Sequence, residues 1–236
     1  MKIALNADVG EGMESDSDLM KYLTYANIAC GGHFGNSETI KEAIQLAKIN
    51  GVKIGAHPSY PDTENFGRKS LNIDRSSLED TLLHQINEFL EISISENIQM
   101  HHIKLHGALY NDVFQNEKLT VWFLNWVNEK YKNVRIFVPV AAKEYIENKY
   151  QEKVIYEAFA DRNYNAQLQL ISRSHNKASI TDPNIALKHV KSMFEDNVLI
   201  SIEGGIKQLK ADTFCLHGDN LNALLIAEKI HELYKY

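Results

Sequence analysis

The stretch NIACGGHFGNSETIKEAIQLAKINGVKIGAH, residues 27–57, holds a complete strand–helix–strand unit, and this unit decides the fold class. Residues 27–30 and 52–56 are short apolar runs of the kind that form buried strands. Residues 37–49 place apolar side chains at helical spacing, and Gly51 is typical of the position just beyond a helix end. Because a helical crossover joins parallel strands, the unit predicts an α/β protein with a parallel sheet.

The same alternation continues on both sides of this unit. Further strands are expected at residues 3–7, 102–105, 135–138, 154–157 and 213–216, and further helices at residues 76–96, 117–131, 141–150, 184–194 and 220–234. Seven parallel strands in this length predict one α/β domain over residues 1–236, a TIM-like, incomplete seven-stranded β/α barrel. A doubly wound open sheet is the alternative, but no G-x-G-x-x-G sequence follows the first strand.

Three segments add a helix start, a long loop and a hairpin to this alternation of strands and helices. Asp182-Pro183 supplies an N-cap followed by proline at the first helical position, so a helix is expected to begin there. Residues 158–182 are polar and lack a clear period, which predicts a long loop near the site. Residues 198–202 and 206–209 flank Gly204-Gly205 and predict a hairpin appended to the core.

The composition is that of an ordinary globular protein, with 44% hydrophobic and 24% charged residues. The net charge is −6 and no basic tract is present, so nucleic acid is not an expected partner. The N-terminus lacks a signal-peptide pattern and no apolar stretch approaches about 18 residues, so we expect a cytoplasmic protein without a membrane partner. Cys30 and Cys215 lie in apolar surroundings and are expected to be buried free thiols.

Polar and ionisable side chains end six of the seven expected strands. In a parallel barrel, functional groups gather at the carboxyl ends of the strands. The residues at or just after these ends are Asn6, Asp8, Glu11, His33, His57, Lys104, His106, Asp161, Arg162, His217 and Asp219. Stability alone explains such a set poorly, because buried charges cost free energy unless they are paired. We therefore expect one polar site at the barrel mouth.

The spacing along the strands indicates which side chains share a face. Side chains two residues apart point to the same side, as Asn6 and Asp8 would, and likewise Lys104 and His106. Facing inward, these groups would serve general acid–base catalysis or hold a divalent metal. In the second case the candidate ligands are Asp8, His33, His57 and His217.

Longer motifs carry a resemblance to a known family. In order, the chain contains LNADVGEG (5–12), ANIACGGH (26–33), IGAHPSYPD (54–62), FGR (66–68), KLHGALYN (104–111), EAFADR (157–162) and HGDN (217–220). Together these segments resemble the family of 5-oxoprolinase A subunits, also called the LamB/YcsF or lactam utilisation family, over essentially the whole chain. One departure is Asn36, where the family commonly has Asp.

The resemblance implies a fold and a reaction. The family's barrel is similar to that of polysaccharide deacetylases and certain glycoside hydrolases. Its members are one component of a multi-subunit, ATP-dependent 5-oxoprolinase, a hydrolase that opens the lactam of 5-oxo-L-proline (pyroglutamate) to give L-glutamate. The implied partners are 5-oxoproline, ATP as co-substrate, and subunits B and C. No Walker A sequence is present, so an ATP site here would not be a P-loop. Homo-oligomer formation and a divalent metal are left open.

The resemblance also implies roles for individual residues. The expected catalytic residues are Asp8, Glu11, Lys104, His106, Asp161, Arg162, His217 and Asp219, and the expected substrate-binding residues are Asn6, His33, His57, Arg68, Tyr110 and Asn111. Lys104 and Arg162 would stabilise phosphate or oxyanion charge. His106 or His217, paired with Asp8 or Asp219, would move protons and position water.

Two other functions fit the same residues. One is a stand-alone, metal-dependent deacetylase or amidohydrolase that uses the metal-ligand candidates named above. The other is a non-catalytic subunit that binds a lactam or sugar, or that acts as a scaffold for its partners.

Overall fold

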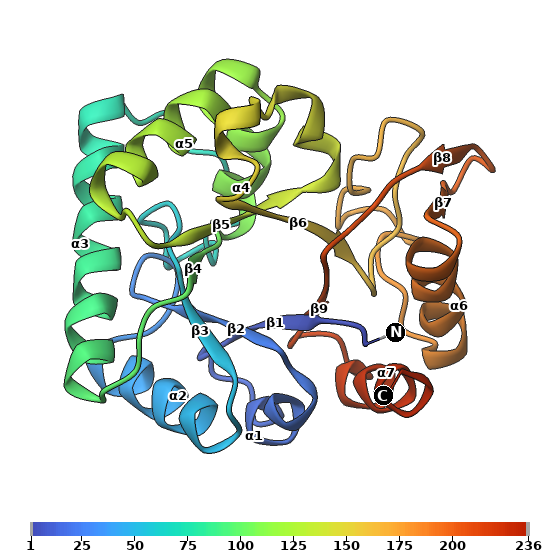
Figure 1. Cartoon of the computed structure of the whole chain (residues 1–236), viewed down its shortest axis with the longest axis horizontal. Coiled ribbons are helices and arrows are strands. Elements are labelled where there is room, and N and C mark those ends of the chain that lie inside the picture. Colours follow the sequence, from blue (N-terminus) through green and yellow to red (C-terminus); the bar gives the residue numbers. More distant parts are fainter. Residues whose placement is uncertain (1, 235–236) are drawn as a thin grey trace.

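Seven parallel strands close into a barrel at the centre of the molecule (Figure 1). The computed structural model describes residues 2–234, so residues 1, 235 and 236 of the predicted domain lie outside the described residues. In order round the barrel the strands are β1 (Leu5–Val9), β2 (Tyr25–Ala29), β3 (Lys53–His57), β4 (His102–Ile103), β5 (Arg135–Pro139), β6 (Val154–Phe159) and β9 (Thr213–His217). Strand β9 pairs in parallel with both β6 and β1 and closes the ring. The predicted seven-stranded barrel is confirmed.

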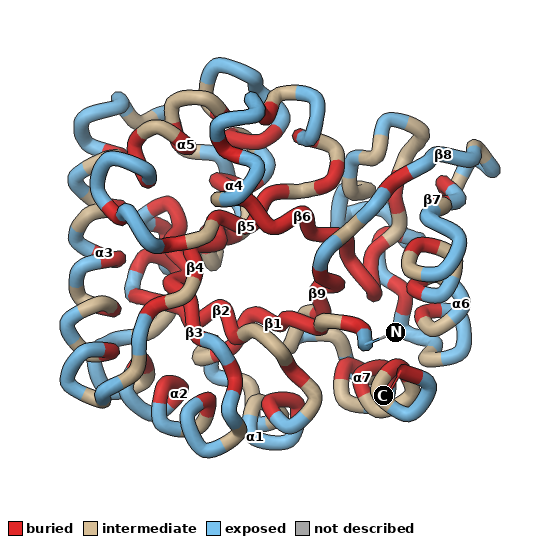
Figure 2. Tube along the Cα trace, viewed as in Figure 1, coloured by how far each residue is buried: buried red, intermediate tan, exposed pale blue. Residues whose placement is uncertain are grey.

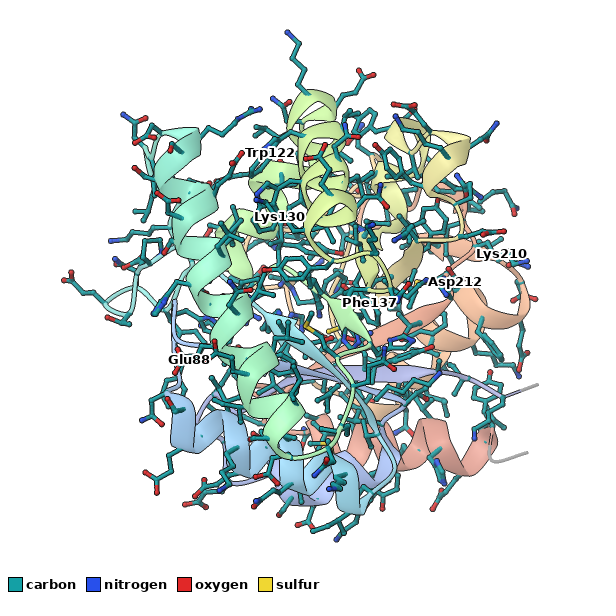
Figure 3. The ribbon with its side chains drawn as sticks, turned by 60° about the vertical axis from the view of Figure 1, so that its left-hand side comes forward. Glu88, Trp122, Lys130, Phe137, Lys210 and Asp212 are labelled. Carbon is teal, nitrogen blue, oxygen red and sulfur yellow. The ribbon has the colours of Figure 1, made fainter. Side chains whose placement is uncertain are left out.

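Helices cover the outside of the barrel, and Figure 2 shows a buried ring of strands inside a largely exposed outer surface. The helices are α1 (Asp16–Leu19), α2 (Ser37–Ile49), α3 (Arg75–Ser95), α4 (Gly107–Phe114), α5 (Glu117–Lys130), α6 (Pro183–Glu195) and α7 (Ala223–Leu233). Figure 3 shows Trp122 and Lys130 on the outer helix α5, whereas Phe137 of β5 lies near the centre of the molecule. None of the helices in the described part of the chain is long and apolar enough to cross a membrane.

Four of these helices, α2, α3, α5 and α6, begin at side-chain caps, and the caps of α6 and α2 bear on the sequence analysis. Asp182 accepts hydrogen bonds from the backbone N–H groups of the first turn of α6, with Pro183 at its first position, as predicted. Asn36 caps α2 in the same way, because its Oδ1 accepts from the N–H groups of Glu38 and Thr39. An Asn therefore serves as the cap where the resembling family commonly has Asp.

The main differences between the predicted and the observed elements lie in the helices. Residues 141–150, expected to form an α-helix, form two short 3-10 helices, Val140–Tyr145 and Asn148–Tyr150. The backbone is extended between them at Ile146 and Glu147, and the side chains of Ile146 and Tyr150 are both buried. Helix α7 begins three residues later than expected, and α1, the 3-10 helix Met20–Tyr22 and α4 were not predicted.

The appended hairpin is confirmed, with a longer turn than expected. Strands β7 (Val198–Ile200) and β8 (Ile206–Gln208) pair antiparallel and form a sheet of their own beside the barrel. Residues 201–205 connect them, and Ser201 N–H donates to the carbonyl of Gly205. The turn is therefore five residues long and not the Gly204-Gly205 pair alone.

The barrel has a polar interior and an apolar exterior. Along β1, Asn6 and Asp8 point inward, whereas Ala7 and Val9 are fully buried beneath the helices. Strand parity produces this division, because alternate side chains face opposite sides of the sheet. Burial against the helices supplies the hydrophobic stabilisation, so the barrel interior is free to hold polar groups.

Candidate active site

Lys104 is the centre of the polar cluster inside the barrel. It is 2% exposed, and its Nζ lies 2.8 Å from Asp8 Oδ1, 3.1 Å from Glu157 Oε1 and 3.0 Å from Cys215 Sγ. Burial would lower the pKa of Lys104, but the carboxylates of Asp8 and Glu157 raise that pKa well above its usual value. The ammonium group therefore stays charged although it is buried.

Asp8 connects Lys104 to a group of imidazoles. Its Oδ2 lies 3.3 Å from His57 Nε2, while Oδ1 accepts from Lys104 and from Asn27 Nδ2. Burial would raise the pKa of Asp8, but His57 and Lys104 lower it well below the ordinary range. Asp8 is therefore ionised at neutral pH.

His57 and His106 face each other next to Asp8. Backbone carbonyls can only accept hydrogen bonds, so His57 Nδ1 donates to Lys104 O at 2.8 Å and His106 Nε2 donates to Phe66 O at 3.0 Å. The other two ring nitrogens, His57 Nε2 and His106 Nδ1, lie 3.0 Å apart. Burial and the neighbouring histidines lower the pKa of His106 well below its usual value.

Glu11 and His33 contact the His106 ring of this pair. Glu11 Oε1 lies 2.8 Å from His33 Nε2 and 3.3 Å from His106 Nδ1. The rings of His33 and His106 stack at a centroid separation of 3.6 Å. Burial lowers the pKa of His33, so its ring is neutral and Nε2 donates to the carboxylate.

A second carboxylate–imidazole pair joins the loop after β6 to the end of β9. Asp161 Oδ1 is 2.8 Å from His217 Nδ1, and Asp161 Oδ2 accepts from the His217 backbone and from Asn220 Nδ2. The His217 ring stacks on Phe159. Burial would raise the pKa of Asp161, but His217 and these hydrogen bonds lower it. The carboxylate thus orients His217 through Nδ1, and no hydrogen bond within residues 2–234 involves His217 Nε2.

Asp219 joins two arginines at the rim. It lies 2.6 Å from Arg68 Nη2 and 3.1 Å from Arg173 Nη1, so it connects the loop after β3 with the long loop after β6. Arg162 holds the same long loop from below, because it donates to the carbonyls of Ala178 and Ile171. Gly107 has φ +56°, and an added Cβ would lie 2.5 Å from the carbonyl oxygen of Gly67, so only glycine lets the start of α4 pack against the loop after β3.

These groups surround a cavity of 420 Å³ at the carboxyl ends of the strands. The predicted site residues that line it are Asp8, His57, Arg68, Lys104, His106, Tyr110, Asn111, Arg162 and His217. Residues 170–173 line its outer side, so the long loop lies at the site, as expected. The cavity is large enough for a small molecule and presents both signs of charge.

The other predicted site residues do not line the cavity. Asn6 lies below it and hydrogen-bonds Thr213 and Asn27 within the barrel. Glu11, His33, Asp161 and Asp219 each contact residues that do line it. The predicted pairing of His217 with Asp219 is replaced by a pairing with Asp161, because Asp219 faces the two arginines. The four predicted metal candidates likewise do not converge, since Asp8 groups with His57 and His106.

Sequence reasoning left three residues out of the site. Glu157 and Cys215 contact the Lys104 ammonium, and Phe159 supports His217. Strand parity could have found the first two. Cys215 is two residues before His217 on β9, and Glu157 lies on β6 with its side chain on the inner face.

Comparisons with known proteins agree with the motifs. The profile described as the LamB/YcsF family matches residues 3–235. A Thermococcus sibiricus protein, named as the A subunit of 5-oxoprolinase, is 38% identical over 96% of this chain and 91% of its own length. A Campylobacter jejuni protein of the same name is 37% identical, over 99% and 94%. The crystal structure of a lactam utilization protein from Thermus thermophilus superposes with a TM-score of 0.85 at 31% identity, covering 100% of this chain and 96% of that one.

Proposed function

This chain belongs to the LamB/YcsF family, and from that premise we propose that it is the A subunit of an ATP-dependent 5-oxoprolinase. In the proposed reaction 5-oxo-L-proline, ATP and two water molecules give L-glutamate, ADP and phosphate. One observation carries the proposal: a buried ammonium group and a carboxylate-oriented imidazole face the same small cavity. The names of the relatives support the choice of a lactam as substrate.

The chemistry needs a phosphoryl group because a lactam is a stable amide. Transfer of the γ-phosphoryl group of ATP to the lactam oxygen releases ADP and makes the ring carbon electrophilic. Water then adds to that carbon, the C–N bond breaks, and the nitrogen takes up a proton. The resulting acyl phosphate reacts with a second water and gives glutamate and phosphate.

Lys104 stabilises the negative charge that develops on oxygen during these steps. Its ammonium is permanently charged, and it lies on the cavity wall with Asp8 and Glu157 fixing its position. A fixed charge in a water-poor site stabilises a transition state more than the same charge in water. Arg162 acts indirectly, since its guanidinium holds the loop that forms the outer wall.

His217 transfers the protons. Asp161 accepts from Nδ1–H and leaves Nε2 with a lone pair that takes a proton from water and returns it to the leaving nitrogen. His106 is less suited to this role, because one ring nitrogen donates to Phe66 O and the other faces His57. Subunits B and C complete the assembly and share the handling of ATP.

Reconstitution tests the proposal. The chain is mixed with its B and C subunits, 5-oxoproline and ATP, and glutamate is measured with each component omitted in turn. We expect glutamate only in the complete mixture, and Lys104→Met and His217→Gln should each lower kcat by at least about 100-fold.

Lys118→Met is the matched control, because Lys118 is exposed on α5, and it should keep full activity. Full activity of Lys104→Met would rule out the proposed role of the ammonium. Glutamate formed by the chain alone without ATP would instead identify a stand-alone amidohydrolase.

A further inference from the structure

We propose that Asp8, His57 and His106 bind one divalent transition-metal ion at the inner end of the cavity. Their ligand atoms all lie within 4.8 Å of one another, and all three residues are buried. Two imidazoles and one carboxylate are a common ligand set for zinc, iron, cobalt and manganese in proteins. This site does not depend on the proposed lactam chemistry.

The hydrogen positions in the rings of His57 and His106 indicate which nitrogens can bind a cation. His57 Nδ1 and His106 Nε2 each face a backbone carbonyl and therefore carry a hydrogen. The other two nitrogens, His57 Nε2 and His106 Nδ1, lie 3.0 Å apart, too close for two bare lone pairs. A cation between them, either a metal ion or a proton, satisfies both nitrogens.

Two carboxylates near this contact also favour a bound cation. Asp8 Oδ2 lies 3.3 Å from His57 Nε2, and Glu11 Oε1 lies 3.3 Å from His106 Nδ1. Neither oxygen carries a hydrogen when the acid is ionised, so four acceptor atoms from four residues surround one region. Asp8 can bind a metal through Oδ2, because Oδ1 is the atom that accepts from Lys104.

The distances are close to those within a first coordination shell, with the contact between the two imidazoles somewhat shorter. Metal–ligand bonds of about 2.0–2.2 Å in a tetrahedral site place neighbouring ligand atoms roughly 3.3–3.6 Å apart. The observed separations are 3.3 Å from Asp8 Oδ2 to His57 Nε2 and 3.0 Å from there to His106 Nδ1. The outer nitrogens of both rings donate to backbone carbonyls, which is the usual support of a metal-binding histidine.

Charge balance favours a divalent ion over an empty site. Asp8, Glu11 and Glu157 are three buried carboxylates, and Lys104 is the ammonium group that lies among them. Their formal charges leave an excess of two negative charges, and uncompensated buried charge is costly. Asp161 and Arg162, further along the chain after β6, offset each other in formal charge. One divalent cation would neutralise the remainder.

The same barrel holds a second possible set of metal ligands, which can be compared with the first. Asp8, Cys215 and His217 also lie within 4.8 Å of one another. That group is less suited, because burial raises the pKa of Cys215 well above its usual value and a metal needs the thiolate. His217 Nδ1 is moreover engaged by Asp161. The two positions differ in sulfur content, so spectroscopy can tell them apart.

Calorimetric titration of the chelator-stripped full chain with Zn²⁺ tests the site. We expect one ion per chain, and His57→Gln and His106→Gln should each weaken binding by at least about 100-fold, since loss of a supporting group alone costs about 10–100-fold. His217→Gln and the exposed-residue control His84→Gln should bind as the wild type does.

Cobalt substitution of the wild type keeps the test independent of how the variants fold. Bound Co²⁺ should show visible ligand-field bands without a thiolate-to-cobalt charge-transfer band. That charge-transfer band, or loss of binding in His217→Gln alone, would place the ion at Cys215 and overturn the proposal. Binding of less than about a tenth of an equivalent would overturn it as well, and would assign the contact to an imidazolium.

Discussion

A charged lysine inside a barrel depends on each of its neighbours. Lys104 receives partners from β1, β6 and β9, so no single strand determines its environment. Removing one partner of a buried ion pair costs about 3–5 kcal/mol, because the remaining charge stays buried. The cluster therefore ties the shape of the barrel mouth to the charge of one ammonium group.

Asp161→Asn is expected to lower kcat by about 10³–10⁴ with little change in KM. The Asn side chain would place an N–H group where the carboxylate oxygens now accept, so His217 would turn to the tautomer that carries hydrogen on Nε2. The reconstituted glutamate assay measures both constants. A rise in KM with unchanged kcat would contradict the proton-transfer role of His217.

The same variant should show a pH-dependent loss of stability. The folded state lowers the pKa of Asp161 below its usual 3.8, so ionised Asp161 stabilises the fold above that pH. This contribution disappears as the pH falls through the lowered pKa. Urea unfolding should therefore find Asp161→Asn less stable than the wild type at neutral pH, with a gap that narrows in acid.

Gly55→Ala is expected to destabilise the fold by about 3 kcal/mol. An added Cβ would lie 2.3 Å from Cδ2 of His102 and 2.5 Å from its backbone oxygen, and backbone cannot move aside cheaply. Gly205→Ala is the control, since the nearest atom to its Cβ would be the Ser201 hydroxyl at 3.2 Å. Equal unfolding free energies for the two variants would contradict this packing argument.

Strand parity made part of the site predictable from single residues. It places Asp8 and Lys104 on inward faces, and the two form an ion pair. It does not fix residues beyond the strand ends, because loop backbone and hydrogen bonds set their direction. Asp161 and Asp219 both follow a strand, yet Asp161 binds His217 while Asp219 binds arginines.

The turn from β1 into α1 contains a carboxyl group with a raised pKa, that of Asp16. Asp16 Oδ2 accepts from the Gly10 N–H at 2.7 Å, but burial and nearby Glu11 raise the pKa of Asp16 to about 6. A carboxyl with a raised pKa stabilises the fold at low pH, and that stabilisation is lost as the pH rises from about 4 to about 6.

Asp16→Asn should therefore stabilise the chain by about 3 kcal/mol above roughly pH 6 and have no effect near about pH 4. The Asn oxygen still accepts from Gly10 and carries no charge. Urea unfolding in the presence of a chelator across this range measures the difference. A variant less stable than the wild type at every pH would show that the charge itself supports the turn.

Elements with a clear period were predictable, and short ones were not. Helix α2 matches the expected residues 37–49, because its apolar positions face the barrel over more than three turns. Helix α4 has only eight residues, five of which are buried, so its sequence is too short to establish a helical period. Residues 141–150 form two 3-10 helices joined by extended backbone at Ile146 and Glu147. The sequence did not reveal this break, because Ile146 and Tyr150 are four residues apart and fit one face of a continuous helix.

Closure of the barrel depends on its last strand, β9. A chain that ends at residue 212 lacks β9 and α7, so β1 and β6 lose their common neighbour and Asn6 loses its hydrogen bond to Thr213. We expect this fragment to unfold without a cooperative transition in urea, because the polar interior opens to water. A cooperative transition like that of the full chain would contradict the prediction.

Replacing residues 198–209 with a short glycine linker is the matched control. The hairpin β7–β8 forms its own sheet and pairs with no barrel strand in the described part of the chain. Its loss should lower stability, since Leu199 is buried, but the transition should stay cooperative because the ring still closes.

Because β1 pairs with β9, the barrel cannot close until the end of the chain has been synthesised. A ribosome adds about 5–20 residues per second, so β1 emerges on the order of ten seconds or more before the strand that completes it. During that interval the nascent chain carries two unsatisfied strand edges, the usual starting points of mispairing. Asn6 and Asp8 on the inner face of β1 make that face a poor surface for apolar aggregation. The side chains assigned to chemistry in the finished molecule would thus protect it while it is being made.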